Sequence, residues 1–181
     1  MIDNKDRSGW IGASDTSFVI GNYATKTFKN WFLEKLGIHQ STLSTKAMKT
    51  GTHYEHKILD TIPGVTKDKQ ILIPELHLRI NLDGNTEDTI YEVKTHRADK
   101  CFKVSKNYRE QVLVQMYASN IKKAYIVAYG LTEDDYLNYF NEIVVDRITY
   151  HEIEYDKDFI KKYLDRLDYI CECLEQGVMP K

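Results

Sequence analysis

Three side chains suited to hydrolytic chemistry lie close together around one predicted turn. Asp83 ends an extended segment, and after a turn-rich stretch Glu92 and Lys94 follow in the next one. Residues two apart in a strand project to the same face, so Glu92 and Lys94 lie together and Val93 points to the opposite layer. Asp83 falls almost opposite the first residues of the returning strand. We therefore predict that the carboxylates of Asp83 and Glu92 share one cation.

The donor atoms of this predicted site favour a hard divalent ion. Two carboxylates and a backbone carbonyl, here that of Val93, suit Mg²⁺, with Mn²⁺ as a substitute. Such an ion neutralises charge on a phosphate and lowers the pKa of a bound water, which Lys94 is placed to orient or help deprotonate. The alternative interpretation is that Asp83-Gly84 only marks a turn and that Glu92 and Lys94 show ordinary strand alternation.

A basic segment begins at the same strand. Between positions 94 and 109 one acid stands among six cations: Lys94, Arg97, Lys100, Lys103, Lys106 and Arg109. Isolated charge runs often form a solvated loop and helix entrance, but this one is also suited to a phosphate track. The whole chain has a net charge of −2, yet residues 131–181 sum to −7 and residues 1–130 to +5. The total excludes a uniformly basic nucleic-acid coat protein, and the positive charge is concentrated in the first part of the chain.

Length and composition favour one soluble domain. The 181 residues are 42% hydrophobic, and no apolar run approaches the ~20 residues of a membrane span. The first residues carry acids where a signal peptide would be basic. Three cysteines are too few for a disulfide framework, a four-cysteine zinc site or a ligated iron–sulfur cluster, and Cys171 falls on an apolar helix face. A reducing cytoplasm is the expected location.

Helical and strand periodicities alternate along the chain. The N-terminal helices fall within 14–61 (14–20 capped by Ser14 or Asp15, 28–36 capped by Thr27, and 44–60), a crossover helix covers 107–120 and a C-terminal helix 156–176. Extended segments are predicted at 70–73, 76–82, 89–95, 123–129 and 139–155, with a hairpin over 76–95. This order predicts a single α/β domain over 1–181, with a mixed central β-sheet flanked by helices.

The motif Asp83…Glu92-Val93-Lys94 resembles the D…ExK core of the PD-(D/E)XK nuclease superfamily, although Leu82 stands where many members have proline. Four further segments, in the same order, resemble the YqaJ-like, lambda-type viral exonucleases: RSGWIGASDTSFVIG from position 7, FKNWFLEKLG, MKTGTHYEH and YREQVLVQMYAS. The resemblance runs from position 7 to at least position 129 and implies a restriction-endonuclease-like fold.

The resemblance also implies roles for individual residues. Asp83 and Glu92 would bind Mg²⁺, Lys94 would assist the attacking water, and Glu55 would add a carboxylate on the metal side. Three residues would hold a terminal 5′-phosphate, with two weaker candidates beside them: Arg7, Ser14 and Gln111, then Tyr108 and Gln115. Without the resemblance, Glu55 would be a solvent-facing helix acid, and lone Arg, Ser and Gln residues are most often surface or capping residues.

The activity that the resemblance implies is a Mg²⁺-dependent exonuclease. It would degrade linear duplex DNA 5′ to 3′ from a 5′-phosphate and release mononucleotides. Family members form rings of three subunits around DNA, and they serve phage recombination with a single-strand annealing protein. We therefore expect a homotrimer of phage or prophage origin in a bacterial cytoplasm, with DNA, and no membrane, as partner. Two alternatives stay open: an endonuclease of the restriction or resolvase type, and a catalytically silent binding module.

Overall fold

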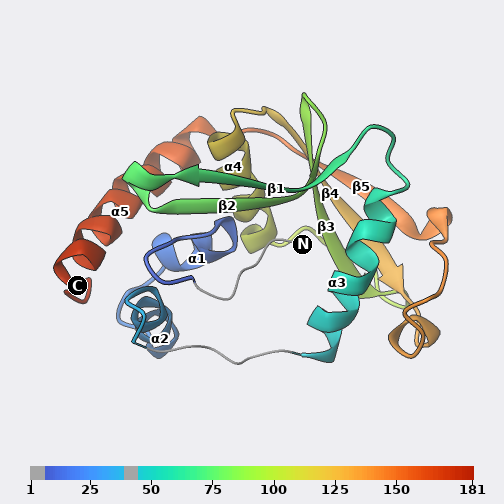
Figure 1. Ribbon diagram of the computed structural model, residues 1–181, viewed down its shortest axis with the longest axis horizontal. Coiled ribbons are helices and arrows are strands. Elements are labelled where there is room, and N and C mark those ends of the chain that lie inside the picture. The colour runs from blue at the N-terminus through green and yellow to red at the C-terminus, as the bar shows by residue number, and fades with distance from the viewer. Residues whose placement is uncertain (1–6, 39–44) are drawn as a thin grey trace.

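A five-stranded mixed sheet forms the centre of the computed structural model, which describes residues 7–38 and 45–181. The strands are β1 (Thr66–Ile73), β2 (Leu78–Asn85), β3 (Thr89–Arg97), β4 (Lys123–Leu131) and β5 (Ile148–Ile153), and they lie in the sheet in chain order (Figure 1). Strands β3 and β4 are parallel, and the other neighbours are antiparallel. The predicted α/β fold with a mixed central sheet is confirmed.

Helices cover both faces of this sheet. They are α1 (Thr16–Val19), α2 (Lys26–Lys35), α3 (Lys46–Leu59), α4 (Lys106–Ser119) and α5 (Lys157–Gln176). Helix α4 carries the chain from β3 to the parallel strand β4, as a parallel pair requires and as the sequence predicts. Side chains of Thr45, Ser105 and Asp156 accept hydrogen bonds from the first turns of α3, α4 and α5 and so fix where these helices begin. Among the described helices, none combines the length and apolarity of a membrane span.

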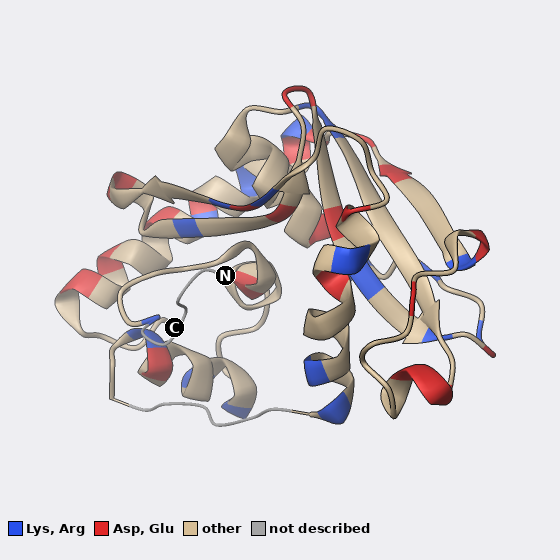
Figure 2. Ribbon diagram, turned by 45° about the vertical axis from the view of Figure 1, so that its right-hand side comes forward, with Lys and Arg blue, Asp and Glu red and all other residues tan. Residues whose placement is uncertain are grey.

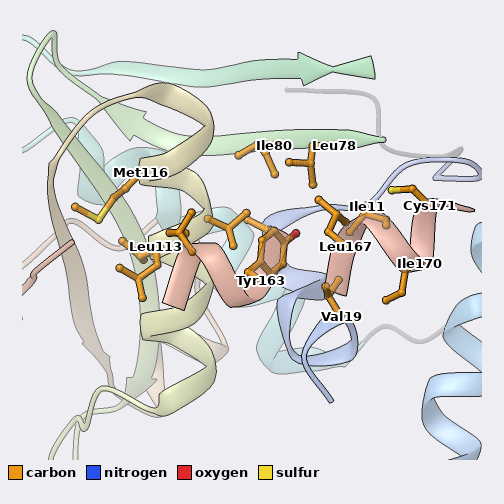
Figure 3. Close-up of a cluster of buried hydrophobic side chains, with 14 of the residues drawn as sticks. Ile11, Val19, Leu78, Ile80, Leu113, Met116, Tyr163, Leu167, Ile170 and Cys171 are labelled. Atoms are coloured by element: carbon orange, nitrogen blue, oxygen red, sulfur yellow. The ribbon is translucent and has the colours of Figure 1, made fainter. Parts of the chain in front are cut away.

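Two hydrophobic clusters lie on opposite faces of the sheet. The larger joins α1, α2, α4 and α5 to β2 and includes Ile11, Val19, Ile80, Leu113 and Leu167 (Figure 3). The smaller packs α3 against β3 and β4 through Tyr54, Ile58, Val93, Val127 and Tyr129. Val93 therefore faces α3, while Glu92 and Lys94 belong to the α4 side, as strand alternation predicts.

Two predicted helix caps are wrong. Helix α2 begins earlier than expected, because Thr25, rather than Thr27, accepts the backbone N–H of Phe28. Near α1 the chain first forms a short 3₁₀ turn, η1 (Ala13–Asp15), and neither Ser14 nor Asp15 caps α1 through its side chain. The Asp15 carboxylate instead accepts the N–H of Gly12. The predicted start of the third helix at Ser44 lies outside the described residues.

The prediction of a strand over 139–155 is also wrong for the first half of that range. Only Ile148–Ile153 pairs with β4, and the preceding residues form a loop with the 3₁₀ turns η3 (Asp134–Tyr136) and η4 (Val145–Arg147). Buried Asp135 holds this loop by accepting hydrogen bonds from Thr132 and Arg147, so local polar bonds replace strand pairing. Strand β1 begins at Thr66, four residues before the predicted start. Its first residues are mostly charged, so the sequence there lacks the alternation of apolar and polar residues that predicts a strand.

Candidate active site

The candidate site lies where β2 and β3 separate (Figure 1). The two strands pair only next to their turn, at Gly84 with Tyr91 and at Asn85 with Ile90. One residue further on, Asp83 Oδ2 accepts the backbone N–H of Val93 at 2.8 Å, which replaces the next ladder bond. The carboxylate of Asp83 is thus fixed in the fork between the strands.

Helix α3 approaches this fork closely because Gly84 has no side chain. A Cβ atom at Gly84 would lie 2.6 Å from Leu59 Cδ2, which is closer than real Cβ atoms approach a neighbour. Leu59 ends α3 and is fully buried, so this contact sets the distance between helix and sheet. Glu55, one helical turn earlier, is thereby brought to the same cavity as Asp83.

Glu92 is held by three donors. Its Oε1 accepts Lys94 Nζ and Gln111 Nε2, each at 2.5 Å, and its Oε2 accepts Gln115 Nε2 at 2.6 Å. The residue is 2% exposed, and both glutamines belong to α4. An ionised carboxylate has about four lone-pair sites, so these bonds leave one for a further ligand. Helix α4 thus fixes the orientation of Glu92.

The carboxylates at the fork repel one another. Burial raises the pKa of Asp83 well above its usual value, and the charges of Glu92 and Glu55 raise it further. Burial likewise raises the pKa of Glu55, with a second contribution from Glu92. Burial lowers the pKa of Lys94, but Glu92 and Asp83 outweigh it and leave the pKa raised, so the ammonium stays charged. One cation among three acids leaves negative charge that a divalent ion would neutralise.

A cavity of about 340 Å³ opens beside these carboxylates. Five of the predicted site residues line it together: Arg7, Ser14, Glu55, Asp83 and Gln111. These residues come from the N-terminal segment, α3, β2 and α4, so only the tertiary fold brings them together. Two of the predicted metal-side residues therefore share one space with the predicted phosphate-side residues, whereas Glu92, Val93 and Lys94 do not line this cavity.

The predicted basic track is not part of this cavity. Arg97 pairs with Asp99 at 2.9 Å and lines a second cavity at the end of β3, and Arg109 bonds Asp156 at 3.0 Å. Lys106 is 80% exposed and lies 3.7 Å from Glu110. Lys100 and Lys103 are exposed on the loop before α4. Tyr108 lies beneath Lys94, with its ring 5.1 Å from Nζ.

The structure adds site residues that the sequence analysis did not single out. Asp15, Lys35, Asp68 and Arg79 also line the cavity. Ligand atoms of Glu55, His56 and Asp68 lie within 4.8 Å of one another, with His56 Nε2 3.0 Å from Asp68 Oδ2. One signal was available for Lys35: it follows Trp31 by four residues and Phe32 by three and therefore falls on the apolar stripe of α2. No comparable local pattern marks Asp68 or Arg79.

Comparisons with known proteins support the fold assignment. Neither a protein-family model nor a curated protein matches the sequence. Among solved structures, an alkaline exonuclease from Laribacter hongkongensis (LHK-Exo) superposes with a TM-score of 0.72 at 20% identity, over 94% of this chain and 90% of that chain. A phage-related exonuclease from Haemophilus somnus gives a TM-score of 0.67 at 14% identity, over 93% and 94%. The chain therefore shares the fold of these exonuclease structures.

Proposed function

We propose that this chain is a metal-dependent deoxyribonuclease, and specifically an exonuclease that degrades linear duplex DNA 5′ to 3′ from a phosphorylated end. One observation carries the proposal: a single cavity contains the carboxylates of Asp83 and Glu55 and also Arg7, Ser14 and Gln111. The first group is suited to phosphodiester hydrolysis and the second to gripping a phosphate. The exonuclease structures with the same fold support this class of enzyme.

The acids present suit a hard divalent ion such as Mg²⁺. Among the described residues, no donor bonds Glu55, and Asp83 accepts a single hydrogen bond, from Val93. These partly buried carboxylates, which have at most one hydrogen-bond donor each, form a set of oxygen ligands together with the spare lone pair of Glu92. Asp83, Glu92 and Glu55 would hold the ion, with the Val93 carbonyl as a further ligand. When bound, it would neutralise charge on the phosphodiester and make a water easier to deprotonate.

The remaining side chains would orient the reactants. Lys94 is held by Glu92 and stays charged, so it is placed to position the attacking water and to stabilise charge on the phosphate. Gln111 both bonds Glu92 and lines the cavity, which joins the hydrolytic side to the phosphate side. Arg7 supplies a guanidinium suited to bidentate contact with phosphate oxygens.

The direction of digestion follows from which end the cavity holds. With a terminal 5′-phosphate at Arg7 and Ser14, the scissile bond lies one nucleotide further along the strand, so cutting releases 5′-mononucleotides. The LHK-Exo structure has also been solved in complex with dAMP, a molecule of this type, with a TM-score of 0.71 at 21% identity. We further propose that the protein forms a ring of three subunits and that it acts in recombination together with a single-strand annealing protein.

Digestion of end-labelled DNA tests the activity. Linear duplexes with 5′-phosphate or 5′-hydroxyl ends and a covalently closed circle are each incubated with and without Mg²⁺ or Mn²⁺. We expect metal-dependent release of mononucleotides, fastest from 5′-phosphate ends. Asp83→Ala should abolish it, whereas Glu87→Ala, an exposed acid in the same hairpin turn, should not.

Two other outcomes would overturn the proposal. Cutting of the closed circle would indicate an endonuclease. Absence of metal-dependent hydrolysis from every substrate would indicate a binding module that retains the fold.

A further inference from the structure

A buried ion pair forms part of the cavity wall. Lys35 Nζ lies 2.6 Å from Asp15 Oδ2, and the two side chains are 3% and 10% exposed. Both residues line the cavity that contains Arg7, Ser14 and Asp83. Lysine and aspartate are rarely this buried, because desolvation of each charge is costly. The pair therefore requires an explanation beyond the packing of α2.

The elements around the pair hold both charges in place. Phe32 and Trp31 bury the apolar face of α2, and Lys35 continues that face toward the cavity. The Trp31 ring lies 5.6 Å from Lys35 Nζ. Asp15 accepts the Gly12 N–H at 2.9 Å, which fixes its carboxylate at the start of η1. Asp15 is thus a positioned anchor for the ammonium group.

Lys35 has hydrogen-bonding capacity to spare. An ammonium group carries three donors, and within the described part of the chain Asp15 is the one acceptor that Lys35 Nζ reaches. Buried donors without acceptors are unfavourable unless a ligand or water satisfies them. Because this group lies in the wall of a polar cavity, an anion entering the cavity would supply the missing acceptors.

We propose that Lys35 is a second cationic ligand of the DNA 5′-terminal phosphate and that Asp15 is the residue that positions it. This inference rests on the proposed function and deepens it. Arg7 and Lys35 together would match the two charges of a terminal phosphate monoester. A 5′-hydroxyl end offers no such group, and an internal diester carries a single charge. The pair would therefore determine the preference for phosphorylated ends.

The test measures binding without cutting. Dissociation constants for duplexes with 5′-phosphate and 5′-hydroxyl ends are compared in metal-free buffer for the wild type and for the double variant Asp15→Asn/Lys35→Met. The double variant removes both charges together, so no unpaired charge is left in the interior. We expect the preference for 5′-phosphate, taken as the ratio of the two constants, to fall at least about tenfold, as expected for loss of a charge-assisted hydrogen bond. Lys29→Met, on the exposed side of α2, is the control.

The outcomes separate this inference from the proposed function. A purely structural pair would weaken binding of both ends equally and lower the melting temperature. That result, an unchanged ratio, or a wild type without 5′-phosphate preference would overturn the inference. Hydrolysis by the wild type with Mg²⁺ reports separately on the proposed function, so either statement can fail without the other.

Discussion

The most constrained side chain of the candidate site is Glu92. It accepts three hydrogen bonds, and two of the donors, Gln111 and Gln115, lie one turn apart on α4. Gln115 is fully buried, does not line the cavity and also donates to the carbonyl of Asn81 at 3.2 Å. It therefore acts on the site through Glu92. In the proposed mechanism Glu92 binds the metal ion, and residues that orient such a carboxylate tune activity without touching the substrate.

Removal of the Gln115 amide should lower turnover. In Gln115→Met the Oε2 atom of Glu92 loses its donor, and we expect kcat to fall about tenfold with KM little changed. Steady-state digestion of 5′-phosphorylated duplex at saturating Mg²⁺ measures both constants. Gln176→Met, at the exposed end of α5, is the matched control. A rise in KM with unchanged kcat would show that Gln115 contributes to substrate binding instead.

At the scale of elements, two threonines near the start of α2 have different roles. Thr25 accepts the N–H of Phe28, whereas Thr27 only donates its hydroxyl to Thr25. We expect Thr25→Ala to lower the free energy of unfolding by about 1 kcal/mol and Thr27→Ala by clearly less. Urea denaturation of both variants measures the difference. A loss at Thr27 as large as that at Thr25 would contradict the assignment of Thr25 as the cap.

The conformation of the loop between β4 and β5 is stabilised by one buried carboxylate, that of Asp135. Asp135 is 1% exposed, and burial opposes its ionisation, but hydrogen bonds from the Thr132 backbone and from Arg147 outweigh burial and lower its pKa to about 2. It also lies within hydrogen-bonding distance of the hydroxyl of Tyr54, whose pKa is raised by burial and by Asp135 to about 12. The loop is thereby fastened to α3, the helix that contains Glu55.

This carboxylate should make stability depend on pH. Because folding lowers the pKa of Asp135 from near 4, its contribution is complete above that pH and is lost as pH falls toward 2. The difference in unfolding free energy between wild type and Asp135→Asn should shrink by about 2 kcal/mol between pH 6 and 2. Urea titrations at several pH values measure it. A constant difference would show that Asp135 does not titrate on unfolding.

Charge is distributed unevenly over the whole molecule. Acids are frequent in the loop after β4 (Figure 2). Lys100, Lys103 and Lys106, by contrast, are exposed in the loop before α4 and at its start. Two cations of the predicted track, Arg97 and Arg109, already pair with Asp99 and Asp156. Any phosphate track on this surface therefore rests mainly on the three lysines.

Charge reversal at these lysines should weaken DNA binding. With Lys103→Glu/Lys106→Glu we expect lower affinity at low salt and a slope of log K against log salt that is reduced by about 2, because two phosphate contacts are lost. Fluorescence anisotropy at several salt concentrations measures both. Lys161→Glu/Lys162→Glu, exposed on α5, changes the net charge equally and should have little effect. Similar losses from both pairs would refute the track.

Sequence alone determined the local features of this protein. Alternation placed Glu92 and Lys94 opposite Val93, apolar spacing located α4 and α5, and the motif around Asp83 indicated a site at the hairpin. These features depend on residues close in the chain, where strand and helix periods act directly. The tertiary structure alone decided that Gln115 holds Glu92 and that Lys35 meets Asp15. Those contacts join residues that are 23 and 20 positions apart. Their geometry depends on how the helices pack on the sheet and on one another, which no local period encodes.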